Sequence, residues 1–427
     1  MKNRFGVIGS IALIMLFLFP MLAWGAEEGI DTGDTAWMLV SATIVLFMVP
    51  GLALFYGGMV RQKNVLNTMM MSFICLGVIT IQWMLWGYSL AFGADIGKVI
   101  GDLSYFGLNG VGLEPSGTIP HQLFAVFQMM FAILTPALIT GAIVERMRFP
   151  AFILFLILWA TFVYDPICHW VWGGGWLMEL GALDFAGGTV VHISSGVSAL
   201  VAALVLGRRK GYGTEPIVPH NVPYVVVGAA ILWMGWFGFN GGSALSAGTL
   251  ASSVYLNTQI AAGAAVVSWV IMEWLRHGKP TVMGAASGAI AGLVAITPAC
   301  GFVTPMGSLI IGLVAGVVCY FAVSTLKIKL GYDDSLDVFG IHGIGGMWGA
   351  LATGLFSVVE GAEGLFYGNA SQIGVQAVGV AATIVLAGVA TFVILKVVGA
   401  ITKLRADSEE EVIGLDVVEH SEKAYSV

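Results

Sequence analysis

Charged residues are scarce in this chain, and their scarcity excludes whole classes of function. Only 10% of the 427 residues are Asp, Glu, Lys or Arg, whereas 58% are hydrophobic. A water-soluble protein of this length needs far more charge on its surface. The few basic residues are dispersed among loops and form no basic stripe with interleaved aromatic residues, the pattern of nucleic-acid binding. Most of the surface is therefore expected to face a lipid bilayer, with no nucleic acid as a partner.

Paired cysteines and clustered metal ligands are also missing. The four cysteines, Cys75, Cys168, Cys300 and Cys319, make no CxxC pair, so the spacing of a zinc or redox site is absent. A disulfide between Cys168 and Cys300 stays open as a minor alternative, since both lie near the same predicted face. We expect no metal, no cofactor and no enzymatic activity.

Long apolar segments, by contrast, recur along the whole chain. Each is about 20 residues long, enough to cross the roughly 30 Å of hydrocarbon in a bilayer. We interpret them as eleven transmembrane helices of an all-α integral membrane protein. The predicted helices cover residues 36–57, 66–91, 121–142, 149–165, 185–207, 222–240, 256–275, 282–298, 305–326, 341–357 and 372–398.

The distribution of Lys and Arg supports both this number of helices and their orientation. Cytoplasmic loops of membrane proteins carry an excess of these residues. With eleven helices and an exported N-terminus, every Lys and Arg beyond the first 25 residues falls on the cytoplasmic side except Lys98. We therefore expect a multi-pass protein of the inner (cytoplasmic) membrane, with the N-terminus outside (periplasmic) and the C-terminus in the cytoplasm. The outside connections carry aromatic residues instead, most clearly at Trp170 to Trp176.

The two ends of the chain differ from its middle. Residues 1–25 are predicted to be a signal peptide, because a charged start and an apolar run lead to Ala23-Trp24-Gly25, whose small residues suit cleavage before Ala26. An uncleaved first helix is the alternative. A transport domain then covers residues 26–401, and the polar residues 402–427 form a cytoplasmic regulatory tail.

An odd number of helices around buried polar residues suggests an internal repeat with one additional helix. Helices 1–5 and 6–10 would run in opposite orientations, as in the inverted repeats of many transporters, and the eleventh would stand alone. Thr135-Pro136 in the third predicted helix matches Thr297-Pro298 in the eighth. The fifth and tenth helices each carry one histidine, His192 and His342.

These two histidines are the main candidates for function, because ionisable residues inside a membrane are costly. At a rise of about 1.5 Å per residue, His192 lies about 12 Å along its helix from Asp184, and His342 about 8 Å from Asp337. The two helices enter from opposite faces, so the imidazoles approach the middle of the bilayer from both sides. We expect them to share a hydrogen bond through their ring nitrogens, and both aspartates to cap their helices.

Neutral imidazoles at this depth suit a neutral polar solute. Each has one donor and one acceptor, a capacity that ammonia shares. Potassium has no proton to give up and would be rejected. A lone buried histidine is more often a packing residue, and two intramembrane histidines could also ligate haem; the matched positions of His192 and His342 favour a pore.

Four motifs stand in order along the predicted helices: Asp184–His192, Gly235–Ser243, Thr281–Val294 and Asp337–Gly343. Together they closely resemble the ammonium transporter family (Amt/Mep/Rh), and within it the bacterial Amt branch. The resemblance runs from about residue 34 to the tail, nearly the whole mature chain.

The resemblance implies an outer site that recruits ammonium. Trp172 and Ser243 would form it, with Phe127 and Phe131 beside it and Asp184 behind it. A cation over a tryptophan face gains about 1–2 kcal/mol when partly desolvated, and a hydroxyl adds an acceptor. We expect Asp184 to act mainly by capping its helix.

The resemblance also implies a pore behind that site. Phe131 and Phe239 resemble the two stacked rings that close its outer end, and His192 and His342 resemble its twin histidines. Ammonium would be deprotonated, and ammonia would pass into the cytoplasm, with or without a separately transferred proton.

Partners follow from the same resemblance. It implies a homotrimer with one pore per subunit and a PII-type signal protein that binds the cytoplasmic face and tail. The family usually has Gly where this chain has Ser421 in the tail. Two alternatives remain: an ammonium sensor or receptor that regulates nitrogen metabolism, and an Rh-type ammonia or gas channel.

Overall fold

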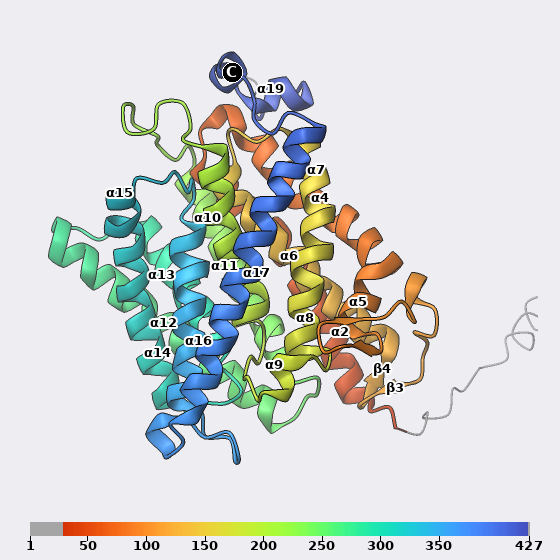
Figure 1. The fold of residues 1–427 in the computed structure, drawn as a ribbon. Helices are drawn as coiled ribbons and strands as arrows, with labels where there is room; N and C mark the ends of the chain where they lie inside the picture. The colour runs from red at the N-terminus through yellow and green to blue at the C-terminus, as the bar shows by residue number, and fades with distance from the viewer. Residues whose placement is uncertain (1–28, 426–427) are drawn as a thin grey trace, which may run out of the picture.

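The computed structural model describes residues 29–425, so the predicted signal peptide lies outside the described residues. Helices run side by side between two ends of the molecule (Figure 1). One end, called the tail end here, carries α18 (Ser408–Ile413) and α19 (Leu415–His420). The opposite end, called the strand end, carries β3 (Pro115–Ser116) and β4 (Ile119–Pro120), which pair antiparallel.

The remaining α-helices follow one another along the chain, and the longest connection between them runs from α5 to α6. They are α2 (Thr32–Leu46), α3 (Met48–Met59), α4 (Val65–Gln82), α5 (Tyr88–Phe92), α6 (His121–Ile143), α7 (Phe149–Trp159), α8 (Asp165–Trp172), α9 (Trp176–Glu179), α10 (Ser194–Leu206), α11 (Val222–Gly242), α12 (Thr249–His277), α13 (Val282–Ile296), α14 (Pro305–Phe321), α15 (Lys327–Leu330), α16 (Ile344–Phe356) and α17 (Ser371–Ile401). The other elements are the 3-10 turns η1 (Gln62–Asn64), η3 (Phe106–Leu108) and η8 (Leu365–Tyr367), the π-turns η2 (Trp83–Gly87), η4 (Ala160–Tyr164), η5 (Gly188–Ile193), η6 (Ala322–Leu326) and η7 (Phe339–Gly343), and the strand pair β1 (Asp95–Ile96) and β2 (Ile100–Gly101).

Nine helical segments of the described chain are long and apolar enough to cross a membrane. Each coincides with one predicted helix. The predicted eighth and tenth helices coincide with shorter segments, α13 and the continuous pair η7 and α16. The all-helical, membrane-spanning fold class is therefore confirmed, whereas the number of eleven crossings stays a prediction.

Four of the five π-turns in the described chain occupy matching places in its two halves, whereas η2, in the second predicted helix, has no counterpart in the seventh. η4 lies in the fourth predicted helix and η6 in the ninth, while η5 and η7 open the fifth and tenth. Such turns are rare and often occur at functional sites. Here η5 contains His192 and η7 contains His342.

The end of the fourth helix differs from the prediction. It was expected to end at residue 165, with Trp170 and Trp172 in an outside connection. Instead, α8 continues the helix to Trp172. Pro166 lies in the first turn of α8 and directly follows the π-turn η4, a place where a helix tolerates proline because the missing N–H needs no helical acceptor. Both tryptophans are therefore fixed on a helix.

The tail packs against the molecule instead of extending from it. The Asp416 carboxylate accepts the N–H of Asn67 at 2.8 Å, and the N–H of Leu415 donates to Oδ1 of Asn64 at 2.8 Å. These bonds satisfy N–H groups that a helix leaves unpaired in its first turn. The tail residue Asp416 thus caps the first turn of α4.

Candidate functional site

A cavity of about 200 Å³ opens between α6, α8 and the residues that follow α11. Its wall includes three predicted site residues, Phe131, Trp172 and Ser243, and no Lys or Arg. The Ser243 hydroxyl donates to the carbonyl oxygen of Phe239 at 2.8 Å, which leaves its lone pairs free to accept. An aromatic face beside a hydroxyl acceptor can hold a small cation that carries hydrogen-bond donors.

Gln128 lines the same cavity and was missing from the predicted residues. Its Oε1 is buried and has no hydrogen-bond partner among the described residues. It precedes Phe131 by three positions on α6, so the two share one face of the helix. A polar residue at that spacing in α6 was the signal available in the sequence.

Two phenylalanine rings connect this cavity with the histidines. The ring centroids of Phe131 and Phe239 lie 4.2 Å apart, with planes tilted by 31°, and both side chains are buried. Phe131 also meets Trp172 edge to face at 5.9 Å. Phe127 does not line the cavity; it packs edge to face on Phe131, with centroids 5.0 Å apart. A solute that moves inward must displace the paired rings.

His192 and His342 lie next to one another beyond those rings. Their Nδ1 atoms are 3.2 Å apart, so one ring donates and the other accepts. Both side chains are buried, and the ring of His192 stacks on Trp236 at 5.5 Å and faces Phe239 at 6.0 Å. Nε2 of His192 is buried and has no partner within the described chain, which leaves one nitrogen free for a solute.

This spacing argues against haem ligation. Two axial imidazoles hold an iron between them, and metal to nitrogen bonds of about 2 Å place the two nitrogens about 4 Å apart on opposite sides of the metal. The two Nδ1 atoms are closer than that and already share a hydrogen bond. No iron fits between them.

Asp184 holds the turn that carries His192. Its carboxylate accepts the N–H groups of residues 187–190 at 2.7 to 3.2 Å. Its backbone carbonyl accepts the indole N–H of Trp172 at 2.9 Å. Asp184 does not line the cavity, so it connects the cavity wall with the histidine turn through the backbone.

The aspartate that caps the second histidine turn is not the one expected. Asp334 accepts the N–H of Phe339 at 2.7 Å. Asp337 directly precedes the helix and its carbonyl oxygen accepts the N–H of Ile341 at 3.0 Å, but its side chain pairs with Lys327. The expectation that the Asp337 side chain caps the helix was therefore wrong.

The correct pairing was readable from spacing. Asp184 precedes His192 by eight residues, and Asp334 precedes His342 by the same number. Equal spacing from the two histidines therefore points to Asp334 and not to the nearer Asp337.

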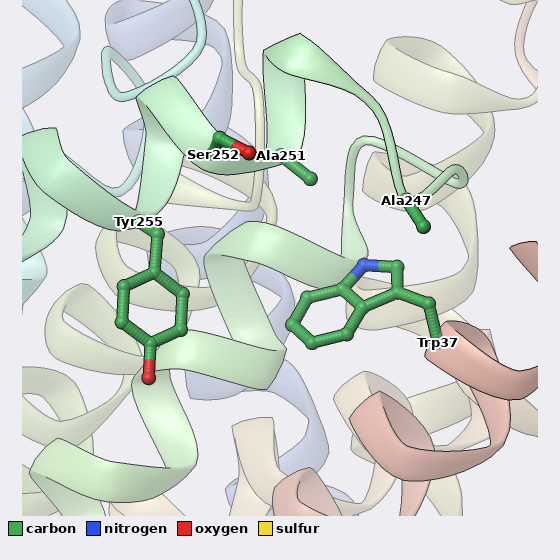
Figure 2. A pocket seen from close by; sticks show the side chains of 5 residues that line it. All are labelled: Trp37, Ala247, Ala251, Ser252 and Tyr255. Carbon is green, nitrogen blue, oxygen red and sulfur yellow. The ribbon is translucent and has the colours of Figure 1, made fainter. Parts of the chain in front are cut away.

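A second cavity, of about 380 Å³, lies beside the N-terminal half of α2. Its lining is Trp37, Ala247, Ala251, Ser252 and Tyr255 (Figure 2). The indole N–H of Trp37 already donates to the carbonyl oxygen of Gly241 at 3.2 Å. The lining contains no carboxylate, histidine, lysine or arginine, so it offers no chemistry comparable with the first cavity.

The fold and the site define a helical membrane protein in which a mostly apolar cavity with one hydroxyl and one amide, two aromatic rings and a histidine pair follow one another through the bundle. The chain belongs to the ammonium transporter family, whose model matches residues 36–425. The resemblance found in the motifs is thus confirmed.

Known relatives span nearly the same length. An "Ammonium transporter" of Bacillus subtilis (strain 168) is 57% identical over 400 residues, which are 92% of this chain and 98% of that one. The crystal structure of Saccharomyces cerevisiae Mep2 superposes with a TM-score of 0.84 at 39% identity, covering 90% of this chain and 89% of that one. A solved structure described as "Sensor Amt Protein" has a TM-score of 0.85 at 31% identity, covering 91% and 98%.

Proposed function

We propose that this protein transports ammonium. Ammonium is recruited in the outer cavity and loses a proton near the phenylalanine rings, and ammonia then moves past His192 and His342 toward the tail end. The observation that carries the proposal is the buried imidazole pair, with 3.2 Å between the Nδ1 atoms, behind the rings of Phe131 and Phe239.

The recruitment step draws on the cavity wall. The Trp172 face attracts a cation, and the Ser243 hydroxyl and the unpaired Gln128 carbonyl accept from its N–H groups. Phe127 supports Phe131 from behind, and Asp184 supports Trp172 through its backbone carbonyl. A cavity with these acceptors and no Lys or Arg favours ammonium over an anion.

The conduction step draws on the neutral histidines. Ammonia can both donate to and accept from a chain of two imidazoles. A potassium ion would have to shed its water without gaining charged ligands, which is costly in an apolar pore. The pair therefore selects for a solute that can become neutral.

The proposal includes a topology. Eleven crossings, with helices 1–5 and 6–10 as inverted repeats and an eleventh at α17, are supported by the π-turns and by the equal spacing of aspartate and histidine in both halves. The N-terminus lies outside the inner membrane after signal removal, and the tail lies in the cytoplasm. The alternation of Lys and Arg supports this orientation.

The proposal also includes partners at the tail end. Homotrimer assembly and a PII-type signal protein are taken from the family resemblance. A cavity of about 450 Å³ between η1 and the tail, lined by Lys63, Asp416, Lys423 and Tyr425 among others, gives such a protein a polar surface to contact.

Flux into proteoliposomes tests the proposal. Purified protein is reconstituted, and radiolabelled methylammonium uptake is compared with that of empty liposomes made in parallel. Uptake well above the empty liposomes is expected; equal uptake refutes transport. Currents on a solid-supported membrane after ammonium addition then decide whether charge moves with the solute.

A sensor is the second candidate, because the "Sensor Amt Protein" shares the fold at 31% identity. A deletion strain separates the two functions. Poor growth at low ammonium indicates transport, whereas normal growth with misregulated nitrogen genes indicates sensing. An Rh-type gas channel would conduct carbon dioxide or ammonia without saturating at the outer site, so saturable methylammonium uptake argues against it.

A further inference from the structure

Gln376 is a buried glutamine of α17 that lines neither the outer cavity nor the histidine pair. It is only 3% exposed. A buried amide is costly unless it is hydrogen bonded, so the partners of this side chain indicate its role.

The Gln376 amide binds the backbone of two distant segments. Its Oε1 accepts the N–H of Leu183 at 2.7 Å, and its Nε2 donates to the carbonyl oxygen of the same residue at 2.7 Å. Nε2 also donates to the carbonyl oxygen of Ala350 at 3.0 Å. One side chain thus satisfies both backbone groups of Leu183, as a neighbouring strand would, and reaches α16 as well.

A close approach of α16 and α17 makes this reach possible. A Cβ added to Gly354 would lie 2.8 Å from the Cα of Ile373 and 3.0 Å from Cγ of Gln376, which is closer than side chains normally pack. Only glycine at this position lets the two helices lie near enough for the amide to bridge them.

Both partners of Gln376 lead directly to the site. Leu183 precedes Asp184, whose carbonyl holds the Trp172 indole and whose carboxylate caps the turn of His192. Ala350 lies on α16, the helix that continues from the turn of His342. Fixing these two backbone points fixes the cavity tryptophan and both histidine turns relative to one another.

We propose that Gln376 is a positioning residue that sets the geometry of the recruitment site and of the histidine pair together. The inference rests on the proposed transport function. It assigns to α17, which contributes no side chain to the cavity wall, a specific part in substrate recognition.

The chain contains a matched control on the same helix. Gln372 lies one turn before Gln376 and is also buried, at 5% exposed. Its Nε2 donates to the carbonyl oxygen of Gly181 at 3.0 Å. It therefore contacts the same loop but binds neither Leu183 nor α16.

The test compares Gln376→Met with Gln372→Met in proteoliposomes. Methionine keeps the length and volume of the side chain and removes its hydrogen bonds. For Gln376→Met, we expect the methylammonium concentration for half-maximal uptake to rise about tenfold, since the three hydrogen bonds of the side chain are lost. Gln372→Met is expected to stay within about twofold of wild type.

The half-saturation concentration separates positioning from mere stability. A variant that only folds less well yields fewer pores, which lowers maximal uptake and leaves half-saturation unchanged. An unchanged half-saturation in Gln376→Met, with wild type active, overturns the positioning role. Wild-type uptake equal to empty liposomes refutes the transport function instead, so the two failures are distinguishable.

Two further measurements apply if Gln376→Met does not fold. Gln376→Asn keeps the amide on a stem one methylene shorter and is expected to shift half-saturation in the same direction. Hydrogen exchange on the wild-type protein needs no variant: the Leu183 amide is expected to exchange at least about tenfold more slowly than the amides of Gly174 and Met178, which donate no backbone hydrogen bond in the described chain. Fast exchange at Leu183 contradicts a stable hydrogen bond between its N–H and the Gln376 side chain.

Discussion

The two turns that carry the histidines are built alike but held differently. In each, an aspartate eight residues before the histidine accepts backbone N–H groups at the start of the helix. Around η5 the supporting side chains are the Asp184 carboxylate and the neutral amide of Gln376. Around η7 a lysine is added: Lys327 donates to the backbone carbonyl of Asp334 at 3.1 Å and pairs with Asp337.

The difference matches what each turn faces. η5 lies next to the cavity proposed to recruit a cation, where a fixed positive charge would repel the solute. η7 lies toward the tail end, where basic residues such as Lys327 and Arg209 gather. The two turns thus share the position of their aspartate cap and differ in their charged surroundings.

The largest expected effect on transport comes from removing the histidine pair that the two turns share. His192→Ala with His342→Ala vacates two ring volumes that water can enter, so a hydrated potassium ion no longer needs to lose its shell. Potassium flux in proteoliposomes should rise at least about a hundredfold, which corresponds to about 2.7 kcal/mol. A double variant that still excludes potassium contradicts the selective role. The single variants should resemble one another, since each breaks the same hydrogen bond.

The caps should differ in their contribution to stability. Asp184→Ala leaves the N–H groups of residues 187–190 without their acceptor and should lower the free energy of unfolding by about 3–5 kcal/mol. Asp334→Ala should cost about 1–3 kcal/mol, since the N–H of Phe339 is its main partner. Denaturant or thermal unfolding in detergent measures both. Asp184→Asn, which keeps an acceptor, serves as the control, and equal losses from the two alanine variants would show that the caps are equivalent.

Asp334 should also make the second turn sensitive to pH. Burial raises the pKa of Asp334 to about 6 from its ordinary 3.8, although Lys327 acts to lower it. The unfolded chain then releases this proton at lower pH than the folded chain, so the contribution to stability is full below pH 3.8 and is lost as pH rises through about 6. The melting temperature of Asp334→Asn minus that of wild type should therefore increase as the pH rises from 3.8 to about 6. Above pH 6 this difference should stay constant. A constant difference between the two proteins would contradict the raised pKa.

The smallest effect is expected at the cavity wall. Gln128→Leu removes one acceptor for ammonium and should raise the half-saturation concentration for methylammonium about threefold to tenfold. Gln122→Leu, on the exposed face of the same helix and away from the cavity, is the matched control. A shift of equal size in both variants would indicate a general effect on α6.

Most of the helices were predictable because their signal is local. About 20 apolar residues in succession need no tertiary information to be interpreted as a membrane-spanning helix. The fourth helix is the exception: it was predicted to end at residue 165, but it continues to Trp172. It does so because the π-turn η4 precedes Pro166 and the helix can continue through this proline. The position of such a turn depends on packing, which sequence periodicity does not report.

The site was predictable as a set of residues but only partly as an arrangement. Phe131, Trp172 and Ser243 share one cavity, whereas Phe127 lies behind it and Asp184 acts through the backbone. Gln128 was missed because α6 also carries Gln122, Thr135 and Thr140, and the sequence alone does not show which of these polar residues faces a cavity.

What the sequence by itself determined is the class of the protein, the order of its helices, and the presence of one histidine in each half. Those properties depend on composition, segment length and spacing along the chain. The expected hydrogen bond between the histidines is present, and the tertiary structure alone decided that it joins their two Nδ1 atoms and that Gln376 binds the backbone of Leu183, 193 residues away. Such contacts depend on how helices cross and how closely they approach. The type of a side chain does not show which distant residue it will contact.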